Sequence, residues 1–138
     1  MPTYSYLNLG DDIPAAPIFP IIVTPPDWAE SIKQYQMDGF LDTGSDCTLV
    51  PLEVLSVLNL KILDRSVTIA GVGGSQLQGF PCYLNIVVGS SPIKAIRAYG
   101  CNWDGLQQRI LIGRDVINRC WIELNGMNST LTINPFED

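Results

Sequence analysis

A run of strictly alternating apolar residues near the middle of the chain constrains the fold more than any other feature. Side chains of a β-strand point alternately to its two faces, so residues spaced by two share one face. The apolar face formed in this way consists of Phe80, Cys82, Leu84, Ile86 and Val88. A Gly89-Ser90-Ser91 turn signal follows, and residues 93–99 alternate again, which predicts a β-hairpin at the centre of the chain.

Several shorter stretches on either side of this hairpin have the same character. Strands are expected at 18–24, 32–41, 66–70, 109–112, 121–124 and 131–133, the last two joined by an Asn125-Gly126 turn. Helical spacing is found only at 51–60, where Pro51 suits a first helical turn, and briefly at 114–118. Many short strands with Gly and Pro turns predict an all-β, small closed β-barrel-like domain with one or two short helices.

The chain length of 138 residues fits a single domain. Six of the ten prolines fall within the first 26 residues. We therefore expect residues 1–13 to form a loosely held N-terminal arm, open to processing, and residues 14–138 to form the domain.

Composition excludes several classes of function. The chain has no histidine, which removes serine and cysteine protease mechanisms that need an imidazole, as well as most zinc sites. Eight basic and fourteen acidic residues give a net charge of -6 without a basic stripe, so no nucleic-acid partner is expected. No signal peptide and no apolar run of about 20 residues is seen, so we expect a cytoplasmic protein with no membrane partner and with reduced, partly buried cysteines.

The most informative segment runs from residue 39 to residue 50, with the sequence GFLDTGSDCTLV. Here an apolar strand ends abruptly in Asp42, Thr43 and Gly44, which places a carboxylate at the mouth of a β-domain. Glycine allows a sharp turn and a close approach of substrate, and the threonine hydroxyl can fix its surroundings. Taken alone, the Asp-Thr-Gly tripeptide is also compatible with an aspartate in an ordinary turn.

Two further blocks follow in order. Residues 69–79 read IAGVGGSQLQG, a glycine-rich stretch between strand-like segments that satisfies no phosphate-loop pattern. Residues 110–124 read ILIGRDVINRCWIEL, in which a short apolar strand, a glycine and a charged pair precede a helical turn.

With these three blocks, residues 18–133 resemble the retropepsins, the single-domain aspartic proteases of retroviruses and their cellular relatives. The helix-like segment at 51–60 makes the DNA-damage-inducible type the more similar branch. The resemblance implies an acid-protease barrel with one lobe per chain. It also implies an aspartic endopeptidase that needs no cofactor and no metal.

The resemblance assigns roles to residues of the first and third blocks. Asp42 matches the catalytic aspartate, and Thr43 matches the residue whose hydroxyl braces the two active-site loops across a dimer. Gly44 matches a backbone contact to substrate. Asp46 and Arg114 match an internal ion pair beside the active site, which we interpret as structural support.

Two further expectations concern Ser45 and the glycine-rich block. A Ser45 hydroxyl that donates to the Asp42 carboxylate would favour an acidic pH optimum. The expected flap over the substrate comprises Ala70, Gly71, Val72, Gly73 and Gly74. Trp103 and Leu106 lie in a segment that either lines a substrate pocket or forms an ordinary surface turn.

The sequence holds one Asp-Thr-Gly, and the chemistry needs two aspartates. An active site would therefore require an isologous homodimer, in which Asp42 of each chain joins a dyad that activates water against an extended peptide or protein substrate. The resemblance implies that both chain ends form the dimer interface, so residues 131–136 and the N-terminal strand are the expected dimer strands. The alternatives are a catalytically silent retropepsin-like dimerisation or peptide-binding module, and a small β-barrel that binds another ligand.

Overall fold

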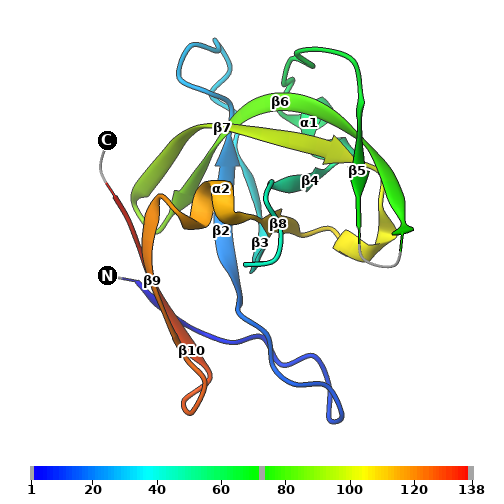
Figure 1. Ribbon diagram of the computed structural model, residues 1–138. Coiled ribbons are helices and arrows are strands. Elements are labelled where there is room, and N and C mark those ends of the chain that lie inside the picture. Colours follow the sequence, from blue (N-terminus) through cyan, green and yellow to red (C-terminus); the bar gives the residue numbers. More distant parts are fainter. Residues whose placement is uncertain (1, 72–73, 137–138) are drawn as a thin grey trace.

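The computed structural model describes residues 2–71 and 74–136 and is mostly β-structure (Figure 1). Its longest strands form the predicted central hairpin, β6 (Gln76–Val88) and β7 (Ser91–Cys101). The other strands are β1 (Thr3–Ser5), β2 (Ile18–Thr24), β3 (Tyr35–Leu41), β4 (Leu49–Pro51), β5 (Val67–Ala70), β8 (Ile110–Ile112), β9 (Cys120–Asn125) and β10 (Thr130–Pro135). The helices are α1 (Leu52–Val57), α2 (Arg114–Ile117) and a 3-10 turn at Asp104–Leu106.

Six of these strands close into a barrel. They pair in the order β2-β3-β8-β4-β7-β6, and β2 pairs again with β6 to complete the ring. β5 extends the sheet outside the ring by pairing with β6 alone. The all-β, closed-barrel prediction is therefore confirmed, with two short helices.

The barrel interior holds the apolar face predicted from alternation. Cys82, Leu84 and Ile86 are fully buried, and Gly89 turns the hairpin with a φ of +62° that an L side chain rarely adopts. The register between β6 and β7 shifts between Leu84 and Ile86. Such an irregularity increases the local twist of a hairpin and helps it to curve around a closed barrel.

Two elements are shorter than predicted. The strand expected at 32–41 begins only at Tyr35, because the preceding segment forms part of a long loop that starts at Pro25-Pro26. The helix expected at 51–60 ends at Val57, where Asn59 has a φ of +54°. The Asn59 amide donates to the Ser56 carbonyl and the Leu60 amide to the Leu55 carbonyl, which is the hydrogen-bond pattern of a Schellman C-cap.

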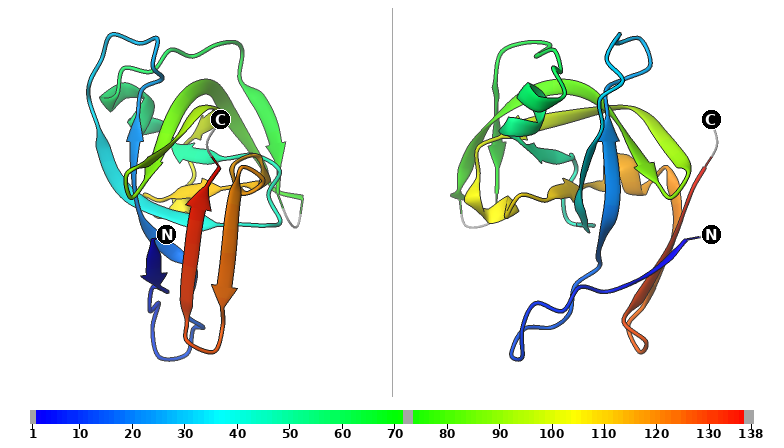
Figure 2. Two further views of the ribbon diagram at one scale, coloured as in Figure 1. Left: turned by 90° about the vertical axis from the view of Figure 1, so that its left-hand side faces the viewer. Right: turned by 180° about the vertical axis from the view of Figure 1, so that it is seen from behind.

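A separate three-stranded sheet, in the order β1-β10-β9, joins the two ends of the chain (Figure 2). Thr3 pairs with Thr132, and the Tyr4 ring lies 5.2 Å from that of Phe19, so the stretch predicted as a loose arm carries an ordered strand. β10 is the middle strand, since it pairs with both β1 and β9, and its buried side chains Leu131 and Ile133 pack into the barrel core. The edges left open in this sheet therefore belong to β1 and β9, whereas most of residues 131–136, expected from the sequence as a dimer strand, lie in the middle strand.

The described helices are short. No helix in residues 2–71 and 74–136 is long and apolar enough to cross a membrane.

Candidate active site

Asp42 lies directly after β3, at the point where this strand leaves the barrel. β3 runs parallel to β8, with Leu41 opposite Ile112, and the Asp42 amide donates to the Ile112 carbonyl over 2.9 Å. Leu41 is buried, whereas Asp42 is half-buried. The strand pairing therefore anchors the backbone of Asp42 while its carboxylate stays accessible.

The residues after Asp42 form a tight turn closed by its side chain. The Gly44 amide donates to Asp42 Oδ1 over 2.9 Å, and the Ser45 amide donates to the Asp42 carbonyl over 3.2 Å. A Cβ added at Gly44 would lie 3.2 Å from Asp42 Oδ1, which explains the value of glycine there. Thr43 and Gly44 are exposed in this turn.

The expected donation from Ser45 to the Asp42 carboxylate is absent. Ser45 Oγ donates instead to the Cys47 carbonyl over 2.7 Å. The hydroxyl thus closes a local turn two residues ahead, a geometry that serine adopts readily. Ser45 supports the shape of the loop and makes no hydrogen bond to the carboxylate.

The ion pair expected between Asp46 and Arg114 is also absent. Arg114 Nη1 donates to the Thr43 carbonyl over 2.9 Å, while its amide donates to the Ser45 carbonyl over 2.8 Å. Asp46 is exposed. Among the described residues, an ion pair is found elsewhere, between Lys94 and Asp27. Arg114 therefore braces the backbone of the loop directly.

A polar network not foreseen from the sequence links the far end of this loop to α2. The buried Thr48 donates through Oγ1 to Asp115 Oδ1 over 2.7 Å and accepts the Gly113 amide over 3.2 Å. Burial raises the pKa of the Asp115 carboxyl, against the hydrogen bonds that lower it. In the sequence, the feature that could have indicated this network is Asp115, an acidic residue in the first turn of a short helix.

Gly113 is required at this junction by close packing. A Cβ built on Gly113 would lie 2.3 Å from the carbonyl oxygen of Cys47, a backbone atom that has no room to move. The loop that carries Asp42 and the start of α2 therefore touch backbone to backbone, and only glycine allows this contact.

Asp42 opens into a cavity of about 420 Å³. Most of its wall is apolar, and it is lined by Leu9, Ile13, Phe40, Asp42, Trp103, Gly105, Leu106, Gln107, Arg109, Ile110 and Leu111. Trp103 and Leu106 both line the cavity that holds the carboxylate, and Trp103 is also exposed beside the 3-10 turn at Asp104–Leu106, so this segment both lines the cavity and forms a surface turn. Leu9 and Ile13 come from the N-terminal segment, and only the folded chain reveals that they lie here.

The described residues of the glycine-rich block lie at the end of the β5–β6 hairpin. Ala70 pairs with Gln76, and the Gly71 amide donates to the Ser75 carbonyl over 2.8 Å. Gly74 has a φ of +78°, which only glycine adopts easily. Val72 and Gly73, the remaining residues of the expected flap, lie outside the described residues.

The nearby thiols do not offer a competing nucleophile. Burial, together with the charges of Asp46 and Asp115, raises the pKa of the Cys47 thiol, so it stays protonated at neutral pH. Burial raises the pKa of Cys101 to about 11 and that of Cys82 to about 12. Among the residues near the cavity, the carboxylate of Asp42 is therefore the group best suited to activate a water molecule.

Comparison with known proteins identifies the fold. No protein-family model and no curated protein matches the sequence. Among solved structures, EIAV protease complexed with the inhibitor HBY-793 superposes with a TM-score of 0.57 and 17% identity, covering 80% of this chain and 92% of that one.

Two cellular proteins give similar results. The retroviral protease-like domain of Ddi1 from Leishmania major has a TM-score of 0.54 and 14% identity, covering 86% of this chain and 89% of that domain. A retropepsin-like aspartic protease from Rickettsia conorii has a TM-score of 0.51 and 16% identity, covering 88% of this chain and 94% of that chain. The chain therefore has the retropepsin fold.

Proposed function

We propose that this chain, which has the retropepsin fold, is an aspartic endopeptidase that acts as a homodimer. The observation that carries the proposal is the position of Asp42, a half-buried carboxylate that lies in a turn at the end of β3 and opens into a largely apolar cavity. Paired strands hold its backbone, and the Arg114 guanidinium and the Thr48–Asp115 hydrogen bond hold the loop around it.

A second copy of the chain completes the proposed site. The sequence contains one Asp-Thr-Gly, so two Asp42 side chains must meet across a two-fold axis. The exposed Thr43 and Gly44 at the top of the turn are free to meet their counterparts in the partner. Each half of the site would then be related to the other by symmetry.

The proposed reaction is hydrolysis by an activated water. Two like carboxylates a few ångströms apart cannot both ionise at low cost, so the pair shares one proton. The ionised Asp42 takes a proton from water, and the protonated Asp42 donates to the scissile carbonyl as the oxyanion develops. A proton then passes to the leaving amine, without an acyl-enzyme, and an acidic pH optimum follows from the shared proton.

The β5–β6 hairpin is the proposed flap. It projects from the closed barrel through β5, which pairs with β6 alone. A hairpin that closes over an extended peptide would exclude water and add strand-like hydrogen bonds to the substrate. The residues assigned to this role are those expected from the sequence, Ala70 to Gly74.

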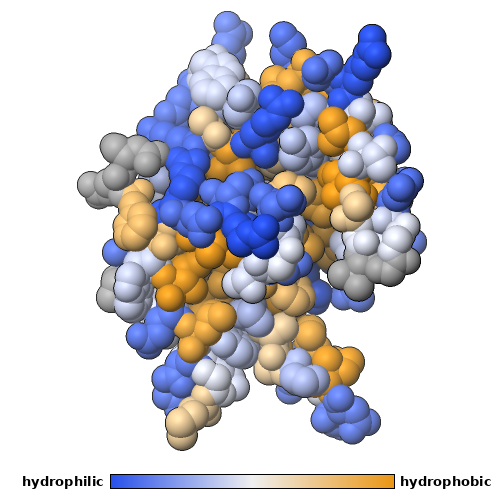
Figure 3. All heavy atoms as spheres, in the orientation of Figure 1, coloured by the Kyte–Doolittle hydropathy of each residue, from blue (hydrophilic) through white to orange (hydrophobic). Residues whose placement is uncertain are grey.

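The surface around the chain ends supports the proposed dimer. Apolar surface gathers along the β9–β10 hairpin and on the N-terminal loop (Figure 3). The exposed apolar side chains there include Trp121, Leu124 and Met127 of the hairpin, together with Ile13 and Phe136. Apolar side chains on and around the open edge of β9 are well suited to pack against a second copy.

The test is cleavage of an unfolded protein substrate between pH 3 and pH 7. Wild-type protein and the Asp42→Asn variant are compared at equal dimer content, and the products are read by mass spectrometry. We expect acid-favoured cleavage in the wild type and a loss of at least about a thousandfold in the variant, since the amide can neither accept the water proton nor share one. Loss of N-terminal residues in the wild type alone would support processing of the first 13 residues.

A wild-type dimer that cleaves nothing across this range would contradict the proposal and favour the silent peptide-binding module. Cleavage that survives in Asp42→Asn would point to a contaminating protease. A wild type found to be monomeric is examined again at higher concentration, where the dimer forms by mass action.

A further inference from the structure

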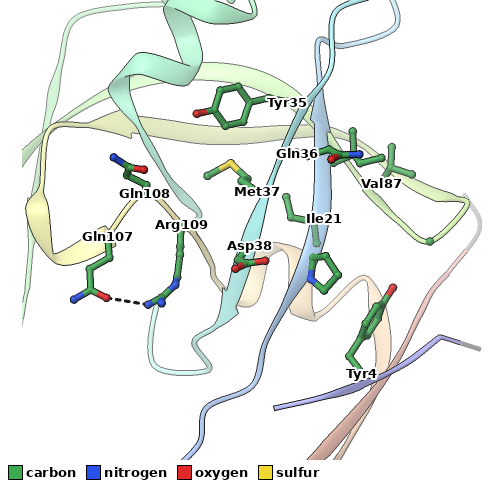
Figure 4. A pocket seen from close by; sticks show the side chains of 13 residues that line it. Tyr4, Ile21, Tyr35, Gln36, Met37, Asp38, Val87, Gln107, Gln108 and Arg109 are labelled. Atoms are coloured by element: carbon green, nitrogen blue, oxygen red, sulfur yellow. Dashed lines mark hydrogen bonds between the residues drawn. The ribbon is translucent and has the colours of Figure 1, made fainter. Parts of the chain in front are cut away.

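Two hollows meet at one arginine. The cavity that holds Asp42 and a larger hollow of about 700 Å³ on the outside of β2 and β3 share two lining residues, Gln107 and Arg109. Arg109 comes directly before β8, and the Ile112 carbonyl at the end of that strand accepts the Asp42 amide. Arg109 therefore lines both the cavity that holds Asp42 and the outer hollow, where Figure 4 shows its side chain beside that of Gln107.

The guanidinium at this junction is held by a neutral partner. Arg109 Nη1 donates to Gln107 Oε1 over 3.0 Å, and the side chain is half-buried. No carboxylate lies within ion-pair distance of it among the described residues, although Asp38 lines the outer hollow too. An arginine has five donors, so most of its hydrogen-bonding capacity is left for a ligand.

The surroundings of Arg109 allow its positive charge to distinguish acidic from basic ligands. Apart from Asp42 and Arg109, no ionisable side chain among the described residues lines the inner cavity, and most of its lining residues are apolar. The chain as a whole carries a net charge of -6, so a positive group beside its candidate active site runs against the general surface charge. Guanidinium groups bind carboxylates in two-point geometry, whereas a cationic side chain in the same place would be repelled.

We propose that Arg109 makes this protein select substrates with an acidic side chain close to the scissile bond. The inference rests on the proposed function and adds a substrate class to it. Arg109 lies three positions before Ile112, which corresponds to about 10 Å along an extended strand. An extended substrate rises by the same amount per residue, so the acidic side chain lies within about three residues of the scissile bond.

In the proposed dimer, the preference for acidic side chains has two-fold symmetry. Each protomer contributes one Arg109, and the two are related by the two-fold axis that relates the two Asp42 side chains. Acidic residues are therefore favoured at matching positions on both sides of the scissile bond, and a substrate that carries one on each side is cleaved best.

The preference also has a pH dependence of its own. A glutamate side chain in a peptide titrates near pH 4.3, whereas an arginine stays charged throughout. The advantage of Glu over Gln in the substrate is therefore absent near pH 3 and grows as the pH rises toward 6. This trend is opposite to that expected for the proposed acid-favoured turnover, so the two are separable.

The experiment compares peptide pairs that differ by Glu or Gln at each of the three positions on either side of one apolar scissile bond. We expect kcat/KM to be about fivefold higher for Glu than for Gln at one position on each side at pH 6, as befits a partly exposed ion pair. The ratio falls to about one at pH 3. Arg109→Gln removes the preference while cleavage of the Gln peptides continues, and Arg109→Glu favours Lys over Gln.

Arg65→Gln is the matched control, since it removes one positive charge from an exposed segment outside both hollows and leaves the ratio unchanged. Equal cleavage of Glu and Gln peptides by the wild type at pH 6 would overturn the proposal, as would a ratio that persists in Arg109→Gln. Binding of the same peptides to Asp42→Asn, read by fluorescence anisotropy, gives the ratio without turnover. A Glu preference in binding that depends on Arg109, with no hydrolysis by the wild type, would support the selectivity and contradict the protease.

Discussion

At the scale of single residues, the site is held more by hydrogen bonds to backbone than by ion pairs. Two expectations from the sequence failed for this reason: Ser45 donates to the Cys47 carbonyl and not to Asp42, and Arg114 donates to the Thr43 carbonyl and not to Asp46. A sequence motif specifies the residue types, but it does not specify which of several nearby acceptors each donor binds within a tight loop. Backbone carbonyls compete well because they are already in place, whether they lie two residues along the chain, as for Ser45, or on a neighbouring loop, as for Arg114.

Thr48 offers the sharpest test at this scale. Thr48→Val keeps the shape of the side chain but removes the donor to Asp115, leaving a half-buried carboxylate with one hydrogen bond fewer. We expect the free energy of unfolding to fall by about 1–3 kcal/mol at pH 7, measured by urea denaturation.

The pH dependence of this loss follows from the raised pKa of Asp115. A carboxyl whose pKa is raised by folding favours the folded state in its protonated form, so the wild type gains stability from Asp115 as the pH falls through that pKa toward the unfolded value of 3.8. The protonated acid depends less on the donor, and the difference between Thr48→Val and wild type should shrink at pH 4. An equal loss at both values would show that Thr48 acts through Gly113 alone.

At the scale of elements, alternation and turn residues predicted most strands, because both report a local backbone preference. The central hairpin and β2 lie where the pattern placed them. Sequence could not show that β10 lies between β1 and β9, since this order depends on contacts between residues more than a hundred positions apart. The same limit explains why Leu9 and Ile13 were missed as lining of the Asp42 cavity.

The proposed flap gives a prediction for the β5–β6 hairpin. Gly74→Ala places a Cβ at a φ of +78° and strains the turn, and within the described part of the chain this Cβ meets no atom within 4 Å. Since β5 lies outside the closed ring, we expect kcat/KM to fall about tenfold while the melting temperature changes by only a few degrees.

Asn59→Ala is a suitable control because it strains a residue of φ +54° after α1, away from the hairpin end. Its cost to stability should be similar and its effect on turnover small. Equal activity of Gly74→Ala and wild type would mean that this hairpin end is only a turn.

At the scale of the whole molecule, activity should depend on assembly. Trp121 is 44% exposed on β9 and Trp28 is 66% exposed on the loop after β2, so the two make a matched pair of surface tryptophans. We expect Trp121→Glu to raise the dimer Kd by about thirtyfold, as for loss of a large aromatic anchor from an interface, and Trp28→Glu to leave it unchanged.

Sedimentation velocity over a range of protein concentrations measures the dimer Kd, and the specific activity is recorded on the same samples. Activity of Trp121→Glu should recover as its concentration rises, since mass action restores the dimer. Full activity in a sample that contains only monomer would contradict a site shared between two chains.

The pairing of Thr3 with Thr132 has a consequence for how the chain can be rebuilt. Both ends of the described chain lie on the same side of the barrel, in one small sheet (Figure 1). A short linker can therefore join them, and new ends can be opened in the exposed loop between β2 and β3, which leaves every strand pairing of the barrel in place. A circularly permuted chain of this kind has no free arm to be removed. It therefore separates the part that the arm plays in folding from any part that its removal plays in activation.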